Sequence, residues 1–322
     1  MKKSLKRLLV SAALTTGLAA SAAQAQERVF FGIATGGTGG TYYPLGGMLA
    51  QVISNNSQLA DKKLSATAET GNASVANAGL LGRGSIESAF VAADVLDAAY
   101  KGKNQFKNKP ITNLRALGAL YPETVQLVAQ PDIGKFEDLK GLSVSSGSPG
   151  SGQWQLLGGL LSSYGMTRDD ISEDYSSFSQ SADKIKDGNL DASLITAGSP
   201  TASLVELSNG HDISIVPLNG PAVDKLLKKQ PYYAKTVLPA GTYKGMDKDV
   251  ETIAVRAIWA THADLSDDVA YAVTKALYEN TDTLAKVHVK GKEISLETAL
   301  ESVSIPLHPG AERYYREKGL IK

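Results

Sequence analysis

Two glycine-rich segments in matching register constrain the fold of this chain more than any other feature. Residues 36–49 read GGTGGTYYPLGGML, and residues 148–161 read SPGSGQWQLLGGLL. When the segments are superposed, Gly40 falls on Gly152, and the paired glycines further along also coincide. Each segment runs from small, flexible residues into an apolar pattern of helical spacing. The match indicates two copies of one strand–loop–helix unit.

The N-terminus has the features of a secretory signal. Basic residues from Lys2 to Arg7 precede an apolar stretch, and AQA at residues 23–25 forms an A-x-A cleavage site. The apolar stretch is too short for a membrane-spanning helix. We therefore expect cleavage after Ala25 and a soluble, periplasmic mature chain that starts at Gln26.

The composition excludes several classes of site. The chain has no cysteine, which rules out disulfides, thiolate metal ligands and a cysteine nucleophile. Removal of the leader leaves 29 basic and 33 acidic residues, a net charge of −4. This mild negative charge argues against nucleic acid as a partner. A mature chain of about 300 residues is long enough for two hydrophobic cores.

Strand and helix patterns alternate along most of the mature chain. Expected strands cover residues 29–33, 88–91, 125–128, 142–144, 173–177, 192–195 and 252–260. Expected helices cover residues 42–54, 74–81, 93–100, 152–164, 181–187, 201–208, 267–279, 281–288 and 295–302. The alternation predicts an α/β protein with mainly parallel sheets, and the helix-rich end predicts a return to the first half.

These patterns predict two lobes, the first of them discontinuous. We expect residues 26–121 and 252–322 to form lobe 1 and residues 122–251 to form lobe 2. The chain would then cross between the lobes near 121–126 and 245–253.

A glycine-rich turn between a strand and a helix suits an anion. Its backbone N–H groups can converge, and the helix adds unpaired first-turn donors and the positive end of its dipole. Glycine, serine and threonine also form turns and helix caps, so either loop alone leaves that simpler interpretation open. Two matching loops in two α/β halves favour a ligand beyond the carboxyl ends of the strands.

The motifs of the common nucleotide and hydrolase sites are missing. Neither loop has the lysine of a P-loop, the first lacks the third glycine of a dinucleotide fingerprint, and Pro149 replaces the serine of G-x-S-x-G. The four histidines have no metal-ligand spacing, and we expect surface or capping roles for them. Small carboxylates fit the loops best, and no cofactor or metal is expected. A serine-dependent hydrolase that uses Ser148 or Ser151 is the alternative, without a credible base in a motif.

Five segments in this order resemble the TAXI family, the solute receptors of tripartite ATP-independent periplasmic (TRAP) transporters. The segments are GTGGTYYPLGGMLA, ETGNAS at 69–74, SSGSPGSG, LDASLITAGSPTASL and IPLHPGAERYYREKG. The resemblance spans essentially the whole mature chain. It implies an α/β two-lobed periplasmic binding protein of the type II class, monomeric and not an enzyme. Such a receptor closes on a small solute and passes it to membrane-embedded TRAP permease subunits. Known members favour glutamate, glutamine or 2-oxoglutarate.

The loop chemistry and the resemblance indicate the same ligand-binding residues. From lobe 1 they are Thr38, Gly39, Gly40, Thr41, Tyr42, Asn72 and Ser74. From lobe 2 they are Ser148, Gly150, Ser151, Gly152, Gln153, Thr196, Ala197 and Gly198. Tyr42 suits either the cleft wall or the core. Asp94 is expected to cap its helix rather than reach the cleft.

Two departures bear on the ligand. Many TAXI sequences have threonine where Gln153 stands, and an amide both donates and accepts. Other TRAP receptors hold a carboxylate with a bidentate arginine, and none lies in these loops. Backbone amides and hydroxyls would then neutralise an anionic ligand. A sensory receptor for the same ligand class remains an alternative to a transport receptor.

Overall fold

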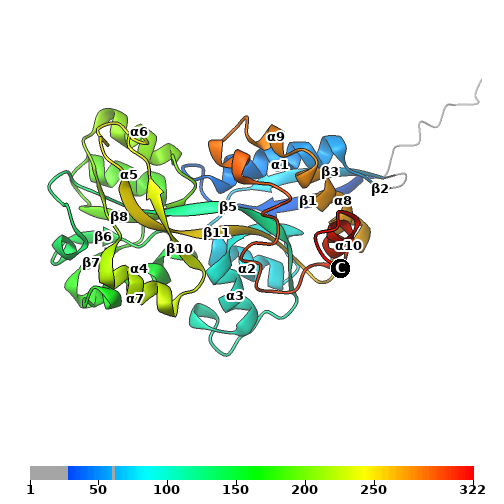
Figure 1. The fold of residues 1–322 in the computed structure, drawn as a ribbon, viewed down its shortest axis with the longest axis horizontal. Helices are drawn as coiled ribbons and strands as arrows, with labels where there is room; N and C mark the ends of the chain where they lie inside the picture. Colours follow the sequence, from blue (N-terminus) through cyan, green and yellow to red (C-terminus); the bar gives the residue numbers. More distant parts are fainter. Residues whose placement is uncertain (1–27, 60–61) are drawn as a thin grey trace, which may run out of the picture.

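The computed structural model describes residues 28–59 and 62–322. The expected leader and its cleavage site lie outside the described residues. Figure 1 shows two lobes joined side by side, with two long strands, β5 (Leu114–Ala129) and β11 (Val250–His262), running from one lobe into the other. No helix in the described part of the chain is long and apolar enough to cross a membrane.

The first lobe combines the N-terminal elements with the C-terminal helices. Its further strands are β1 (Arg28–Ala34), β2 (Gln58–Leu59), β3 (Lys62–Glu69) and β4 (Ser88–Ala92). Its helices are α1 (Tyr42–Asn56), α2 (Ser74–Gly82), α3 (Ala93–Lys101), α8 (Asp267–Tyr278), α9 (Thr281–Leu284) and α10 (Pro309–Glu317), with 3₁₀ turns η1 (Asn104–Phe106) and η4 (Val289–Glu293). The blue and the orange-to-red parts of Figure 1 therefore lie together.

The second lobe comes from the middle of the chain. Its further strands are β6 (Ser143–Ser145), β7 (Ser172–Asp174), β8 (Ala192–Ala197), β9 (Ser214–Val216) and β10 (Tyr233–Leu238). Its helices are α4 (Gln153–Ser163), α5 (Phe178–Lys186), α6 (Ala202–Gly210) and α7 (Gly220–Lys229), with 3₁₀ turns η2 (Phe136–Leu139) and η3 (Arg168–Asp170).

The strand order is the same in the two lobes. Lobe 1 has the order β3-β1-β4-β11-β5, in which β1 is parallel to β3 and β4, and β11 is antiparallel to β4. Lobe 2 has the order β7-β6-β8-β5-β9, in which β6 is parallel to β7 and β8, and β5 is antiparallel to β8. The fourth strand in each order is one of the two long strands, β11 in lobe 1 and β5 in lobe 2. This repeated topology confirms the two-lobed α/β fold of the type II class.

The strand β5 changes partners at one residue. Residues 114–124 of β5 pair with β11 and residues 124–129 pair with β8 and β9, so that Thr124 pairs both with Ala254 of β11 and with Ala197 of β8. The sequence predicts only 125–128 as strand here, whereas the structure extends the strand back through Pro122 to Leu114. The structure accommodates the proline beside a register shift in β11, between Arg256 and Ile258.

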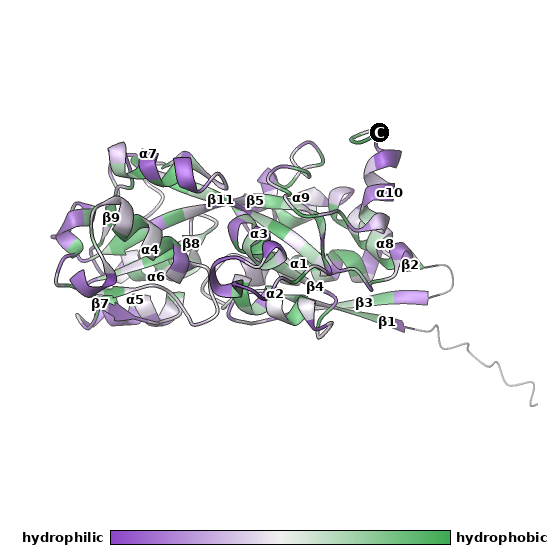
Figure 2. Cartoon of the chain, turned by 90° about the horizontal axis from the view of Figure 1, so that it is seen from below, coloured by the Kyte–Doolittle hydropathy of each residue, from purple (hydrophilic) through white to green (hydrophobic). Residues whose placement is uncertain are grey.

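The core follows the alternation of the strands. In lobe 1, Phe90 and Trp259 point to the face covered by α1, α8 and α10, whereas Val91 and Ile258 point to the face covered by α2 and α3. This second face continues into lobe 2 without a break, through residues such as Leu157 of α4. Figure 2 shows the hydrophobic residues concentrated on the strands and the hydrophilic residues on the outer surfaces of the helices.

Most expected elements match the structure, but residues 295–302 are turns instead of a helix. The Ser295 hydroxyl accepts a hydrogen bond from the Thr298 N–H, and the Thr298 hydroxyl bonds back to a carbonyl, which gives the backbone an alternative to the helix. Ser302 then takes a positive φ of 59°. The helix α10 was not expected from the sequence, although His308 as N-cap and Pro309 in the first turn mark its start.

Candidate functional site: a cavity between the lobes

A cavity of about 250 Å³ lies between the lobes, beyond the ends of several strands. It is lined by residues from both lobes: Gly36, Gly37, Thr38, Gly39, Gly40, Thr41, Tyr42, Gly71, Asn72, Ala73, Ser74, Ala92, Asp94, Glu123, Ser148, Ser151, Gly152, Gln153, Leu156, Ser177, Phe178, Ser179, Thr196, Ala197, Tyr233 and Val255. The N-termini of α1 and α4 both reach it. A place beyond the strand ends is where ligands bind in open α/β sheets.

The first glycine-rich loop touches the opposite lobe directly. The Thr41 hydroxyl donates a 2.9 Å hydrogen bond to the Gly198 carbonyl, and the Gly39 carbonyl accepts one of 3.2 Å from the Ser203 N–H. A Cβ on Gly39 would lie 2.4 Å from the Ser179 Oγ. A side chain at this position would require the Ser179 hydroxyl to move away, because the lobes meet closely, and these contacts describe a closed arrangement.

The second glycine-rich loop also makes an inter-lobe contact. The Gly150 carbonyl accepts hydrogen bonds from the N–H groups of Val75 and Ala76, at 2.9 and 3.0 Å. These two donors are in the first turn of α2, so Gly150 occupies the helix N-terminus that the sequence analysis assigned to the ligand. Gly150 has φ +89°, a backbone conformation that favours glycine.

Two polar side chains of lobe 2 without a described hydrogen-bond partner line the cavity. Ser151 is 7% exposed and Thr196 is half-buried, and neither side-chain oxygen has a hydrogen-bond partner in the described part of the chain. Buried polar groups without a partner are rare, and a bound ligand would satisfy these two. Gln153 lines the cavity as the first residue of α4, whereas Trp154 is 40% exposed and stacks against Arg168. Trp154 and Tyr42 occupy the same position in the two aligned segments, but Trp154 is exposed whereas Tyr42 is buried.

Tyr42 is both a core residue and a wall of the cavity. Its ring packs edge-to-face on Phe90, and its hydroxyl donates a 2.8 Å hydrogen bond to the Glu123 Oε2. Glu123 is 4% exposed, and burial together with the negative charge of Asp94 raises its pKa to about 8, against the hydrogen bond from Tyr42. Much of the Glu123 population is therefore protonated at neutral pH in the ligand-free cavity.

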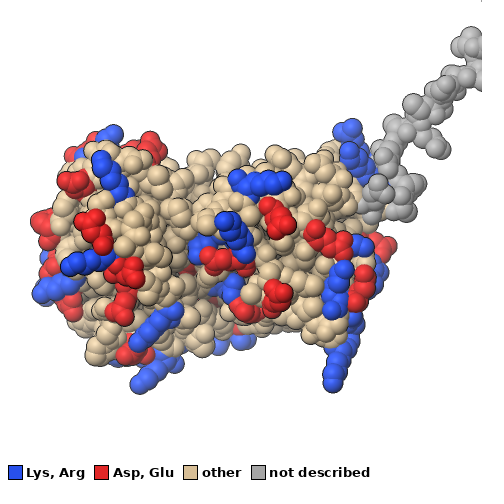
Figure 3. All heavy atoms as spheres, turned by 45° about the horizontal axis from the view of Figure 1, so that its top comes forward, with Lys and Arg blue, Asp and Glu red and all other residues tan. Residues whose placement is uncertain are grey.

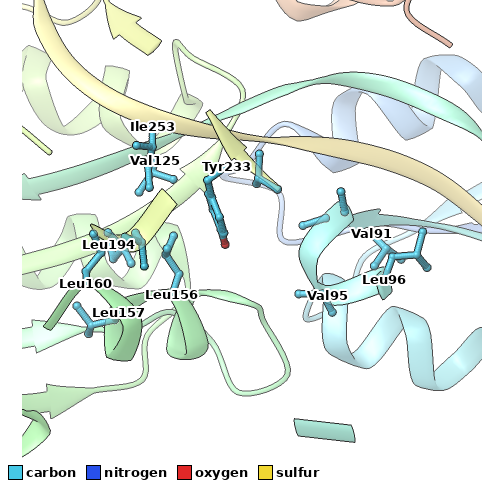
Figure 4. Close-up of a cluster of buried hydrophobic side chains, with 14 of the residues drawn as sticks. Val91, Val95, Leu96, Val125, Leu156, Leu157, Leu160, Leu194, Tyr233 and Ile253 are labelled. Atoms are coloured by element: carbon cyan, nitrogen blue, oxygen red, sulfur yellow. The ribbon is translucent and has the colours of Figure 1, made fainter. Parts of the chain in front are cut away.

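Asp94 also reaches the cavity, contrary to the expectation of a helix cap. The N-cap position of α3 is Ala92, while the Asp94 Oδ2 accepts a 2.8 Å hydrogen bond from the Tyr233 hydroxyl. Burial raises the pKa of Asp94, although this hydrogen bond and nearby backbone N–H groups favour the charged form. In Figure 4 the Tyr233 side chain extends into the space between Leu156 of lobe 2 and Val95 of lobe 1.

The cavity brings together 13 of the 15 residues that the sequence analysis selected, and Gly150 and Gly198 are outside its lining. Some of the 13 already have other partners. Ser74 Oγ accepts a hydrogen bond from the Ala92 N–H. Ala73, which lines the cavity as the N-cap of α2, has φ 61° and ψ −149°. Such strained backbone is typical of functional sites. A ligand-binding role for the 15 residues stays a prediction.

Sequence reasoning missed Asp94, Glu123, Tyr233 and the segment 177–179 as lining residues. One signal was present for the segment: Ser177 follows β7 and caps α5, so it belongs to another strand–loop–helix unit. No local signal pointed to Tyr233, because its partner Asp94 is 139 residues away.

The described lining contains no arginine, lysine or histidine. His308 and His288 instead cap α10 and η4, in agreement with the expected capping roles. Within the described ranges, no group of three or more acidic or histidine side chains is placed to hold a metal ion. On the surface, Figure 3 shows acidic and basic side chains interspersed over both lobes on the face in view.

The fold and the cleft between its lobes define a two-lobed, type II-like periplasmic binding protein architecture. Residues 33–319 match the model of the NMT1-like family, and the chain belongs to this family.

Several solved structures are similar to this chain at low sequence identity. A protein of Bordetella bronchiseptica RB50 is 16% identical with a TM-score of 0.55, covering 90% of this chain and 98% of its own. A Xanthomonas citri protein solved with ATP is 11% identical with a TM-score of 0.51, covering 89% of this chain and 94% of its own. The periplasmic aliphatic sulphonate binding protein SsuA of Escherichia coli is 18% identical with a TM-score of 0.49, covering 90% and 83%.

Proposed function

We propose that this chain is an extracytoplasmic receptor that captures a small amino acid or organic anion between its lobes. The proposal rests on a cavity that is lined by residues of both lobes and closed by hydrogen bonds between their loops. Each lobe supplies only part of the lining, so the complete site exists only when the lobes meet. Glutamate, glutamine and 2-oxoglutarate are the ligands we propose first, because known TAXI receptors bind them.

The size and polarity of the cavity support a small ligand with a carboxylate. About 250 Å³ is below the roughly 300–1,000 Å³ typical of sites for drug-sized ligands. The Ser151 hydroxyl and the N-terminus of α4 offer hydrogen-bond donors and a favourable dipole for a carboxylate. These groups would hold the carboxylate without an arginine.

The moving bodies would be the two lobes with the boundaries expected from the sequence, 26–121 with 252–322 and 122–251. Thr124, where β5 passes from β11 to β8, lies within the proposed hinge at 121–126. The start of β11 at Val250 lies within the second proposed hinge at 245–253.

Export and delivery complete the proposal. The expected signal at residues 1–25 would send the chain to the periplasm, and a TRAP permease in the membrane would accept the solute. The proposed role is binding without chemistry: Ser151 has no described histidine beside it in the cavity to act as its base.

A thermal-shift screen of amino acids, monocarboxylates and dicarboxylates tests this function. A solute that binds the native state raises its apparent stability, and calorimetry then measures the affinity. A shift with at least one small carboxylate-bearing solute, and no turnover of it, is expected. A panel without any binder at millimolar concentration would contradict the receptor. Uptake by a TRAP permease in proteoliposomes, with and without the loaded receptor, tests delivery.

A further inference from the structure

Two carboxyl groups, Asp94 and Glu123, lie at the wall of the cavity without a described cationic side chain in its lining. Each is held by a tyrosine: Tyr233 donates to Asp94 Oδ2, and Tyr42 donates to Glu123 Oε2, both at 2.8 Å. The two tyrosines come from different lobes, so the closed arrangement orients both carboxyl groups.

The acceptor capacity of this pair is not filled by the protein. The Asp94 Oδ1 is buried and has no hydrogen-bond partner in the described ranges. Burial raises the pKa of both phenols, so their hydroxyls stay protonated and act as donors. An ionised carboxylate in a buried site needs a cation or further donors. Each tyrosine supplies one hydrogen bond, and the backbone N–H groups that favour the charged form of Asp94 leave its Oδ1 without a described partner.

The cavity also contains groups that favour a negatively charged ligand group. The Ser151 Oγ, 7% exposed and without a described partner, lies at the N-terminus of α4, where a helix favours negative charge. The lining thus combines an acidic part with a part that suits a carboxylate. A dicarboxylate alone would place negative charge next to the acidic pair.

We propose that Asp94 and Glu123 form a subsite for an ammonium group, so that the ligand is a zwitterionic amino acid. This inference rests on the proposed receptor function and narrows its ligand class. An ammonium has three donors, enough to reach the open Asp94 Oδ1, Glu123 and one further acceptor. The carboxylate of the same ligand then faces Ser151 and α4.

Ligand binding should also move a proton. The groups that face Glu123 are Tyr42 of α1, Tyr121 of its own strand, Asp94 of α3 and Tyr233 of β10. With a pKa of about 8, Glu123 is mostly protonated at pH 7 in the closed arrangement without a ligand. An ammonium nearby favours the ionised form, so Glu123 releases up to one proton to the buffer on binding.

Matched pairs of amino acids and keto acids test the ammonium subsite. Calorimetry at pH 7 compares L-glutamate with 2-oxoglutarate, L-alanine with pyruvate, and L-leucine with 4-methyl-2-oxopentanoate. The amino acid of the pair that binds should bind at least about 100-fold more tightly than its keto acid. Equal or tighter binding of the keto acid would overturn the ammonium subsite and leave the receptor function intact. A panel in which neither series binds would overturn both.

An isosteric variant locates the subsite. Asp94→Asn keeps the shape but removes the charge, so it should weaken amino-acid binding about 100-fold and leave keto-acid binding unchanged or improved. Asp212→Asn, at an exposed loop position, is the matched control and should bind like the parent. Unchanged amino-acid affinity in a folded Asp94→Asn variant would contradict the proposal.

Proton release provides a readout that does not depend on the Asp94 variant folding. Calorimetry of the native protein at pH 7 is carried out in phosphate and in Tris, whose ionisation enthalpies differ. Proton release should make the two binding enthalpies differ by up to the difference between the ionisation enthalpies of the buffers. The difference should disappear in Glu123→Gln. Equal enthalpies in the two buffers for the native protein would argue against an ammonium beside Glu123.

Discussion

Thr41 and Gly198 lie 157 residues apart in the sequence and join the two lobes through one buried hydrogen bond of 2.9 Å. Thr41 is 2% exposed and is the residue immediately before α1. Its hydroxyl does not cap α1, because it is used for the opposite lobe. A residue that the sequence assigns to the ligand thus also closes the site.

Thr41→Val should weaken ligand binding, because the closed state would lose the inter-lobe hydrogen bond to the Gly198 carbonyl, which would keep only its 3.0 Å bond from the Thr201 hydroxyl. One lost hydrogen bond of this kind is worth about 0.5–1.5 kcal/mol, which corresponds to about 2- to 13-fold in affinity. Calorimetry with L-glutamate, or with the tightest ligand of the screen, measures the change. Thr236→Val on the edge strand β10 is the control and should keep the parent affinity. Parent-like binding by Thr41→Val would show that this bond does not matter for closure.

Gly150→Val should cost more affinity than Ser151→Ala. Valine is strained at φ +89°, and its Cβ would lie 3.3–3.4 Å from the side chains of Ala76 and Asn72 in the other lobe. Ser151→Ala removes one hydroxyl from a charged ligand group, a loss of roughly 1.5–3 kcal/mol or about ten- to hundred-fold in affinity. Circular dichroism checks the fold of both variants, and calorimetry measures binding. If both bind like the parent, the loop serves only as a turn and a helix start.

In the closed arrangement, the contribution of Glu123 to stability should fall as the pH rises from about 5 to 8. Folding raises the pKa of Glu123 from 4.5 to about 8, so over this range the folded protein holds a proton that the unfolded chain releases. The stabilisation is therefore complete below the unfolded pKa and is lost as the pH approaches the folded value, by up to about 1.4 kcal/mol per pH unit.

Urea unfolding at several pH values measures this slope. Glu123→Gln should flatten the pH profile, whereas Glu206→Gln, at an exposed position in α6, should keep it. A profile in Glu123→Gln as steep as that of the parent would assign the slope to other groups.

Gly118→Ala should destabilise the lobe that contains the C-terminal helices. A Cβ on Gly118 would lie 2.2 and 2.3 Å from the hydroxyl oxygens of Tyr278 and Tyr315, which donate to β5 carbonyls on either side. Overpacking of this kind costs about 1–3 kcal/mol, visible as a lower midpoint of thermal unfolding. Gly134→Ala, where a Cβ meets open space, is the control. Equal midpoints would show that α8 and α10 are attached to β5 more loosely than the contacts indicate.

The sequence was sufficient for the features that are encoded locally. The two glycine-rich loops, the helices that follow them and their convergence on one cavity all follow from the strand–loop–helix pattern. Capping by His288 was within reach of the same reasoning. The same local patterns predict the fold class, which the structure confirms.

Features that depend on distant segments were out of reach. Tyr42 meets Glu123 across 81 residues, and Tyr233 meets Asp94 across 139, with no pattern that relates the partners. The use of Gly150 as an acceptor for α2 also arises only when the lobes meet. Local patterns could indicate a donor-rich loop but not the acidic groups opposite it.

Small-angle X-ray scattering measures whether the lobes close when the solute binds. The native protein is measured without ligand and with a saturating concentration of the tightest solute from the screen, with occupancy verified by calorimetry. The account predicts a smaller radius of gyration in the bound sample, and a bound profile that matches the closed arrangement with Thr41 against Gly198. Identical profiles at full occupancy, both more open than this arrangement, would contradict it.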